Sequence, residues 1–223
     1  MTVTFLSSRQ EVDNVWTYFF EPSEAMTWRA GEYINYTLSG IPPSQAERLF
    51  TIASAPYEHR LQITTIAGPS EFKQRLRELN PGDKIEVDQL GGDFSYQEDG
   101  RDKLYLAGGI GITPFRSIIL DRAHNNLPNH AVLLYAGRHG HRPFLNEFGA
   151  VEKSDDTFKK LDYEDKRLSA EEIIRAVPDA KDRTIYIAGP QPFVEGLGLE
   201  LADAGVPKNQ IKFDWFDGYH GLE

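Results

Sequence analysis

Cysteine is absent from the 223 residues of this sequence. Without cysteine the chain can form no disulfide, hold no cysteine-ligated zinc or iron–sulfur cluster, and offer no thiol nucleophile. No apolar run approaches the roughly 18 residues that a membrane span requires, and the N-terminus has no signal-peptide hydrophobic segment. A basic surplus is missing too, because the net charge of -10 disfavours attraction to nucleic acid or anionic membranes. We therefore expect a soluble, cytoplasmic protein that binds neither nucleic acid nor membrane.

The remaining composition is that of a folded protein. Hydrophobic residues make up 40% of the chain and aromatic residues 12%, which is enough for a packed core and excludes wholesale disorder. The length exceeds that of one typical domain, so we expect one large domain or two compact ones.

The first hundred residues consist mainly of short segments rich in β-branched and aromatic residues. Turn residues such as Gly31 and Pro56 separate these segments, and this spacing favours a β-sandwich or a closed barrel. One helix is predicted over 71–79, where Pro81 and Gly82 follow and end it. The predicted strands are Thr2–Leu6, Val15–Phe20, Glu32–Leu38, Arg48–Ala53 and Leu61–Ala67.

Near residue 100 the pattern changes to alternating strands and helices. Uninterrupted apolar strands separated by helices indicate a parallel sheet covered on both faces. We therefore predict a β domain over 1–99 and an α/β domain over 100–223. The predicted strands of the second domain are Leu104–Ala107, Ala131–Ala136, Thr184–Ala188 and Gln210–Phe216, and its helices are Pro114–His124 and Phe193–Ala204.

A glycine-rich turn follows the first strand of the second domain, in the sequence Leu104-Tyr-Leu-Ala-Gly-Gly-Ile-Gly-Ile-Thr-Pro114. Glycines let the backbone approach a diphosphate, and a helix N-terminus supplies free N–H donors. Thr113 is the predicted N-cap, with Pro114 at the first helical position. No third glycine follows Gly111, so the dinucleotide fingerprint G-x-G-x-x-G is not matched. The alternative is a plain strand-to-helix turn.

Two other stretches have ligand-binding chemistry. In Arg48–Ser54 the strand alternation places Arg48 and Phe50 on one face, where a guanidinium can bind a phosphate and a ring can pack on another ring. The alternative is an edge strand with a solvated arginine. The turn at Gly189-Pro190 ends another strand, and the carboxyl ends of parallel strands line one crevice. It can therefore face one bound molecule together with the glycine-rich turn.

The residues of the last predicted strand point alternately to two different faces. Its apolar face consists of Ile211, Phe213 and Trp215, and its other face consists of Lys212, Asp214 and Phe216. An aromatic ring beside an acid and a lysine favours a stacking role for Phe216, with packing between domains as the alternative. The pair His139 and His141 lacks the further ligands of a metal site, so no metal is expected.

Together these motifs, in this order, resemble the ferredoxin–NADP reductase-like flavoprotein family over nearly the whole chain. Arg48-Leu-Phe50-Thr51 is similar to the flavin signature of that family, and Gly82-Asp83 and Gly91-Gly92-Asp93-Phe94 are similar to its later barrel landmarks. The glycine-rich turn and Gly189-Pro190 are similar to its nicotinamide-binding motifs, and Asp214-Trp-Phe216 to its terminal acid-x-aromatic pair.

The resemblance implies a six-stranded antiparallel barrel that holds FAD and a five-stranded parallel domain that binds NADH or NADPH. Arg48 would bind the flavin diphosphate, Phe50 would pack on the flavin, and the Thr51 hydroxyl would lie near flavin N5. Thr51, Asp214 and Phe216 are the implied catalytic residues, with Phe216 covering the flavin. The other implied cofactor-binding residues are Leu49, Ile63, Thr64, Thr65, Gly68, Pro69, Ser70, Gly109, Gly111, Thr113, Pro114, Arg138, Gly189, Pro190 and Gln191.

The chain departs from the family pattern at Ala188, where a cysteine is common, and at Asp214, where glutamate is usual. The acidic run 162–165 slightly favours NADH, whereas Arg138 and Arg142 favour NADPH. The implied activity is hydride transfer from NAD(P)H to FAD, followed by electron transfer to a separate acceptor. That acceptor could be ferredoxin, flavodoxin, a haem protein, free flavin or a ferric complex. A non-catalytic flavin- or nucleotide-binding module is the alternative, and a monomer is expected.

Overall fold

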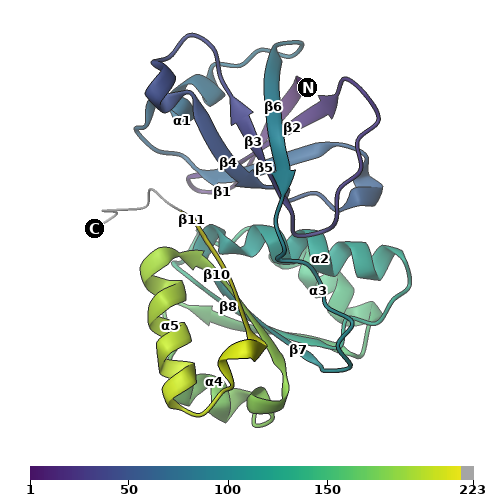
Figure 1. Cartoon of the computed structure of the whole chain (residues 1–223), viewed down its shortest axis with the longest axis vertical. Coiled ribbons are helices and arrows are strands. Elements are labelled where there is room, and N and C mark those ends of the chain that lie inside the picture. The colour runs from purple at the N-terminus through teal and green to yellow at the C-terminus, as the bar shows by residue number, and fades with distance from the viewer. Residues whose placement is uncertain (217–223) are drawn as a thin grey trace.

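The computed structural model describes residues 1–216 and consists of two sheets stacked along the long axis of the molecule (Figure 1). The N-terminal sheet has six antiparallel strands in the order β4-β3-β6-β1-β2-β5, and the C-terminal sheet has five parallel strands in the order β11-β10-β7-β8-β9. This confirms the predicted fold class. The N-terminal strands are β1 (Thr2–Val12), β2 (Val15–Pro22), β3 (Tyr33–Thr37), β4 (Glu47–Thr51), β5 (Leu61–Ile66) and β6 (Lys84–Gly91).

The N-terminal sheet curls around one aromatic core. Phe5, Phe20 and Tyr36 pack there at ring-centroid distances of 5.4 to 5.5 Å, and helix α1 (Glu71–Arg77) adds Phe72. The segment after β4 approaches β5, where the N–H of Ala53 donates to the carbonyl oxygen of Gln62 (2.9 Å). This bond joins the two edges of the sheet at one point, so the sheet has the form of a half-barrel.

The C-terminal sheet is covered by helices on both faces. Its strands are β7 (Lys103–Gly108), β8 (Ala131–Gly137), β9 (Phe158–Glu164), β10 (Thr184–Pro190) and β11 (Ile211–Phe216). Helices α2 (Thr113–His124) and α3 (Leu145–Ser154) pack on one face, and α4 (Ala170–Ala176) and α5 (Gln191–Asp203) pack on the other. Alternate residues of the buried strands supply both cores, as Tyr105 faces α2 while Leu104 and Leu106 face α5. Apolar residues at nearly every position of β7, β8 and β10 therefore mark a sheet with two buried faces.

Several elements differ from the sequence-based expectations. The residue pattern did not identify β6, β9, α3 or α4, and β1 extends six residues beyond its predicted end at Leu6. The missed strand β9 lies at the edge of its sheet, where most of its side chains are only partly buried. The predicted boundary at residues 99 and 100 falls between β6 and β7, and the division into two domains stays a prediction. No helix in residues 1–216 is long and apolar enough to cross a membrane.

Candidate functional site

The glycine-rich turn lies at the carboxyl end of β7. It forms a short 3₁₀ helix, η3 (Gly109–Ile112), which continues directly into α2. The expected N-cap role of Thr113 is therefore wrong: Thr113 is the first residue of α2, Ile112 is the cap, and Pro114 is the second helical residue. The Thr113 hydroxyl donates to the carbonyl oxygen of Ile110 (3.2 Å), so it stabilises the preceding turn instead of the helix N–H groups.

The glycines of this turn serve two different purposes. Gly109 has φ of +54°, and a Cβ built there would meet nothing within 4 Å, so this position faces open space. A Cβ on Gly111 would lie 2.2 Å from the carbonyl oxygen of Ala188. The turns after β7 and β10 thus pack directly against each other, and Gly111 is needed for that contact. Gly109 is the position where a ligand can approach the backbone.

A groove of about 220 Å³ opens beside Gly109 at the carboxyl ends of β7, β8 and β10. Its cationic lining residues, Lys166 and Arg167, follow β9 and were not among the predicted site residues. The groove also contains Pro190, whereas the predicted Gln191 begins α5 and donates from Nε2 to Glu195 (2.7 Å). Arg138 is exposed just after β8. Lys166 and Arg167, which also pairs with Glu200 (2.9 Å), place positive charge beside an open glycine, and this chemistry suits a dinucleotide phosphate.

The two sheets meet through Thr51 and Asp214. Thr51 ends β4 and is buried, and its hydroxyl donates to the Asp214 carboxyl on β11. The pKa of Asp214 is raised to about 7, mainly by burial and to a smaller degree by the neighbouring Asp93 carboxylate, while the Thr51 hydrogen bond lowers it. This arrangement gives a carboxyl group that can hold or release a proton near neutral pH.

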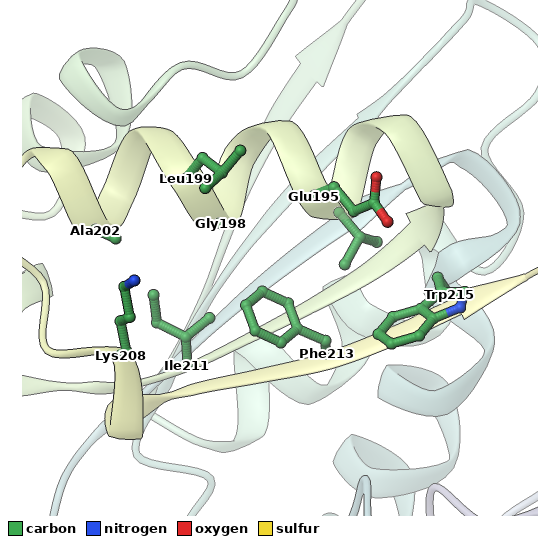
Figure 2. Close-up of a pocket in the computed structure, with 9 residues that line it drawn as sticks. Glu195, Gly198, Leu199, Ala202, Lys208, Ile211, Phe213 and Trp215 are labelled. Carbon is green, nitrogen blue, oxygen red and sulfur yellow. The ribbon is translucent and has the colours of Figure 1, made fainter.

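Strand alternation orients Asp214 as predicted. Ile211, Phe213 and Trp215 stand on the opposite side of β11, where they line an apolar groove of about 480 Å³ against α5 (Figure 2). Gly198 of α5 makes room for Phe213, since a Cβ there would lie 2.6 Å from the Phe213 ring. The side chain of Phe216 and residues 217–223 lie outside the described residues, so the stacking role predicted for Phe216 stays a prediction.

The predicted flavin strand is divided between core and surface. Phe50 is half-buried and packs on Tyr36 and Phe72, with ring centroids 6.0 and 5.7 Å away. Arg48 is exposed and donates to the carbonyl oxygen of Glu47 (2.8 Å), and Leu49 is exposed as well. The face shared by Arg48 and Phe50 thus begins at the surface and ends at the rim of the barrel core.

The predicted contacts on β5 are buried. Ile63 belongs to the barrel core and is fully buried. The hydroxyl groups of Thr64 and Thr17 lie 2.8 Å apart, and Thr65 is buried nearby. The turn from Gly68 through Pro69 leads to Ser70, whose hydroxyl accepts from the backbone N–H of Lys73 (3.4 Å) as the N-cap of α1.

Some buried polar atoms in the described part of the barrel half lack a hydrogen-bond partner. Within residues 1–216, the buried Ser54 hydroxyl and Gln62 Oε1 have no hydrogen-bond partner. Buried polar groups without partners commonly indicate a ligand or water that the protein is built to bind. Together with the open Gly109 and the Thr51–Asp214 pair, they fit a flavin and a dinucleotide at this edge.

Sequence reasoning missed one buried charge next to this edge. Arg116 follows Thr113 by one helical turn and bonds to Glu58 and Glu147. The available signal was a charge among the apolar residues Phe115, Ile118 and Ile119. The two loop histidines instead lie beside carboxylates, His139 at 2.7 Å from Glu164 and His141 at 3.7 Å from Asp13.

Comparison with known proteins agrees with this architecture. Residues 105–197 match the family described as oxidoreductase NAD-binding domain. A flavohemoprotein of Pseudomonas aeruginosa is 22% identical, in an alignment that covers 92% of this chain and 56% of the relative. The chain spans about three fifths of the length of such relatives.

Solved structures with the same fold include two whose covered length is nearly complete. The flavohem-like FAD/NAD-binding domain of nitric oxide dioxygenase from Vibrio cholerae has a TM-score of 0.82 at 19% identity, covering 96% of this chain and 98% of that one. Ferredoxin-NADP+ reductase from Plasmodium falciparum has a TM-score of 0.81 at 14% identity, covering 96% and 95%. Residues 105–197 are thus similar to oxidoreductase NAD-binding domains, and the whole chain has the two-sheet fold of these FAD/NAD-binding and ferredoxin-NADP+ reductase structures.

Proposed function

We propose that this protein is a reductase that takes a hydride from NAD(P)H and passes electrons to a separate acceptor. The observation that supports it most directly is the hydrogen bond from Thr51 to Asp214, which joins the barrel to the parallel sheet beside the glycine-rich turn. FAD, when bound, supplies the acceptor for the hydride and the carrier that releases the electrons. The protein residues contribute binding, orientation and proton control.

On the nucleotide side, the open Gly109 and the cations Lys166 and Arg167 would hold the phosphates of NAD(P)H. On the flavin side, Arg48 would bind the diphosphate, and Phe50 with Thr51 would contact the ring system. The sequence-predicted contacts on β5 and on the turn 68–70 are proposed to hold the rest of FAD. Phe216 is proposed to cover the flavin.

Asp214 and Thr51 are proposed to manage the proton. The carboxyl can hold a proton at Oδ near neutral pH, and the Thr51 hydroxyl can donate to the ionised form or reorient towards a ligand. Because Asp214 is a methylene shorter than the glutamate usual in the family, it needs the close approach of β11 to β4 that this hydrogen bond provides.

The electron acceptor is proposed to be a separate redox group. Relatives named flavohemoprotein support a haem acceptor, and fold neighbours named ferredoxin reductase support an iron–sulfur protein. These 223 residues contain no cysteine, so an iron–sulfur cluster would be held outside them.

Visible spectroscopy tests the proposal. We expect the purified protein to bind FAD and the bound FAD to be bleached by NADH or NADPH under anaerobic conditions. Two variants, Thr51→Val and Asp214→Asn, are assayed in parallel. Loss of FAD binding in Thr51→Val would not by itself show that the protein is a reductase, so the rate of flavin reduction is measured in Asp214→Asn. A protein that binds FAD but is bleached by neither nucleotide would be a flavin-binding module instead of an enzyme. A protein that binds no FAD would contradict the proposal outright.

A further inference from the structure

Arg116 is a fully bonded, buried guanidinium. Its side chain is only 5% exposed, and each of its five N–H donors has an acceptor. Nε donates to Glu147 (2.7 Å), and one Nη2 hydrogen donates to the other oxygen of the same carboxylate (3.0 Å). Nη1 donates to the carbonyl oxygen of Ala53 (2.8 Å) and to Glu58 (2.8 Å), and Nη2 donates also to Glu58 (3.2 Å). The guanidinium is therefore held by two carboxylates from opposite sides.

The acceptors come from both halves of the molecule. Ala53 and Glu58 lie in the barrel segment between β4 and β5, two and seven residues after Thr51, with Glu58 ending the 3₁₀ helix η2 (Pro56–Glu58). Glu147 lies in the first turn of α3, in the same half as Arg116. Arg116 itself follows Thr113 by three residues. One side chain thus ties the segment after the proposed flavin strand to the helix after the nucleotide turn.

Neighbouring contacts run along the same interface. The Ser117 hydroxyl donates to the carbonyl oxygen of Ser54 (2.7 Å), and the ring of Tyr57 stacks on His124 with centroids 3.8 Å apart and planes within 5°. The barrel has its own apolar core, whereas the core beneath α2 also receives Phe94 and Ala30 from the N-terminal half. The halves therefore meet through apolar contacts as well, and the polar links add a fixed direction to them. A planar, bidentate guanidinium fixes angle as well as distance, which a lysine ammonium cannot do.

We infer that Arg116 is a positioning residue for the reaction: through Glu58 and Ala53 it fixes the orientation of the barrel segment 51–58 relative to the glycine-rich turn. It acts through those residues and not by touching either cofactor. This inference rests on the proposed function. Hydride transfer depends on reactant alignment, and a misplacement of about 1 Å can lower a rate on the order of 100-fold.

The two carboxylates provide a matched pair of variants. Glu58→Gln weakens the link between the halves, whereas Glu147→Gln weakens a bond of similar length within one half. We expect Glu58→Gln to slow the reduction of bound FAD at saturating NADH by about 10- to 100-fold, and Glu147→Gln by less than about 3-fold. The dissociation constants for FAD and NADH should change little in both, because neither residue is proposed to contact them. The inference would be overturned if both variants slowed reduction equally, or if Glu58→Gln weakened FAD or NADH binding without changing the rate of reduction.

Calorimetry of the cofactor-free protein adds a readout that does not depend on activity. We expect the wild type to unfold in one transition and Arg116→Lys to unfold in two, because the halves then melt separately. The control is Arg183→Lys: Arg183 is 12% exposed and bonds to Asp179 (2.8 Å) and to the carbonyl oxygen of Lys103 (3.1 Å), both in the C-terminal half. It should lower the melting temperature and keep one transition.

A single transition in Arg116→Lys would contradict the coupling. If the wild type is not reduced by nucleotide at all, the proposed function fails, while the calorimetry still decides whether Arg116 couples the halves. If Arg116→Lys does not fold, the Glu58→Gln and Glu147→Gln pair decides the same question.

Discussion

Replacing Asp214 by asparagine should make the protein more stable at alkaline pH and leave it nearly unchanged at acid pH. The ordinary pKa of the aspartate is 3.8, and burial, together with Asp93, raises it to about 7 in the folded protein. Between these values the folded state binds a proton that the unfolded state does not, so the free energy of unfolding falls as the pH rises. The loss of stability caused by ionising the Asp214 carboxyl is therefore complete above pH 7 and absent below pH 4.

The size of the effect follows from the pKa difference. Each pKa unit is worth about 1.4 kcal/mol, which gives an upper limit of about 4 kcal/mol for a carboxyl raised from 3.8 to about 7. Asp214 is only partly buried, so solvent reduces this limit, and we expect about 2 kcal/mol. Asparagine has no charge to bury and can still accept the Thr51 hydrogen bond, so the variant avoids the penalty.

Urea unfolding of the cofactor-free protein at pH 4.5 and pH 8 measures this difference. Comparing the variant with the wild type at each pH cancels the titration of all other groups. Asp93→Asn is the control. It removes only the charge repulsion on Asp214, so it should raise the free energy of unfolding at pH 8 by a smaller amount. If Asp214→Asn has the same effect at both pH values, Asp214 ionises normally, and its proposed role in holding a proton near neutral pH is wrong.

Three further predictions concern the cofactor sites. Arg48→Ala should weaken FAD binding by about 10- to 100-fold, the cost of one charge-assisted hydrogen bond, and unchanged affinity in a fluorescence titration would remove Arg48 from the site. NADH should reduce the protein faster than NADPH, because Arg142 is already bound to acidic residues of β9 and is not available to a 2′-phosphate; a tenfold preference for NADPH in steady-state assays would mean that the cations after β9 decide. Gly111→Ala should lower the melting temperature far more than Gly109→Ala, because only the first puts a Cβ against backbone, whereas the second costs about 1 kcal/mol for its positive φ; equal losses would contradict the packing role of Gly111.

The parts of the fold that sequence predicts best are the fully buried strands. β7, β8 and β10 are apolar at nearly every position because both of their faces are covered, and their short length favours strands over helices. β9 has the sequence Phe-Lys-Lys-Leu-Asp-Tyr-Glu, whose polar residues are tolerated at a sheet edge and hide its strand character. β6 lies inside its sheet, but its inward apolar alternation is limited to Ile85 and Val87 before a polar, exposed end, so its strand pattern is short.

The candidate site was predictable where it depends on local chain geometry. The strand alternation placed Asp214 opposite Phe213, and the glycine-rich turn located the carboxyl edge of β7. The N-cap assignment of Thr113 failed because a 3₁₀ helix precedes α2 without a break, and no residue type distinguishes that arrangement from an ordinary cap. The partners of Arg116 could not be predicted, since Glu58 is 58 residues away and meets it only after both halves have folded.

The position of β11 has a consequence for the stability of the site itself. β11 is an edge strand, and within residues 1–216 it pairs only with β10, yet it contains the acid that meets Thr51. Folded proteins open locally at free energies well below that of global unfolding, and edge elements are among the first to do so. Detachment of this one strand would separate the acid from the hydroxyl while the barrel core and the other four parallel strands stay intact. The proton-holding pair therefore exists only as long as β11 stays attached, and the amide exchange rates of β11 report how often it is lost.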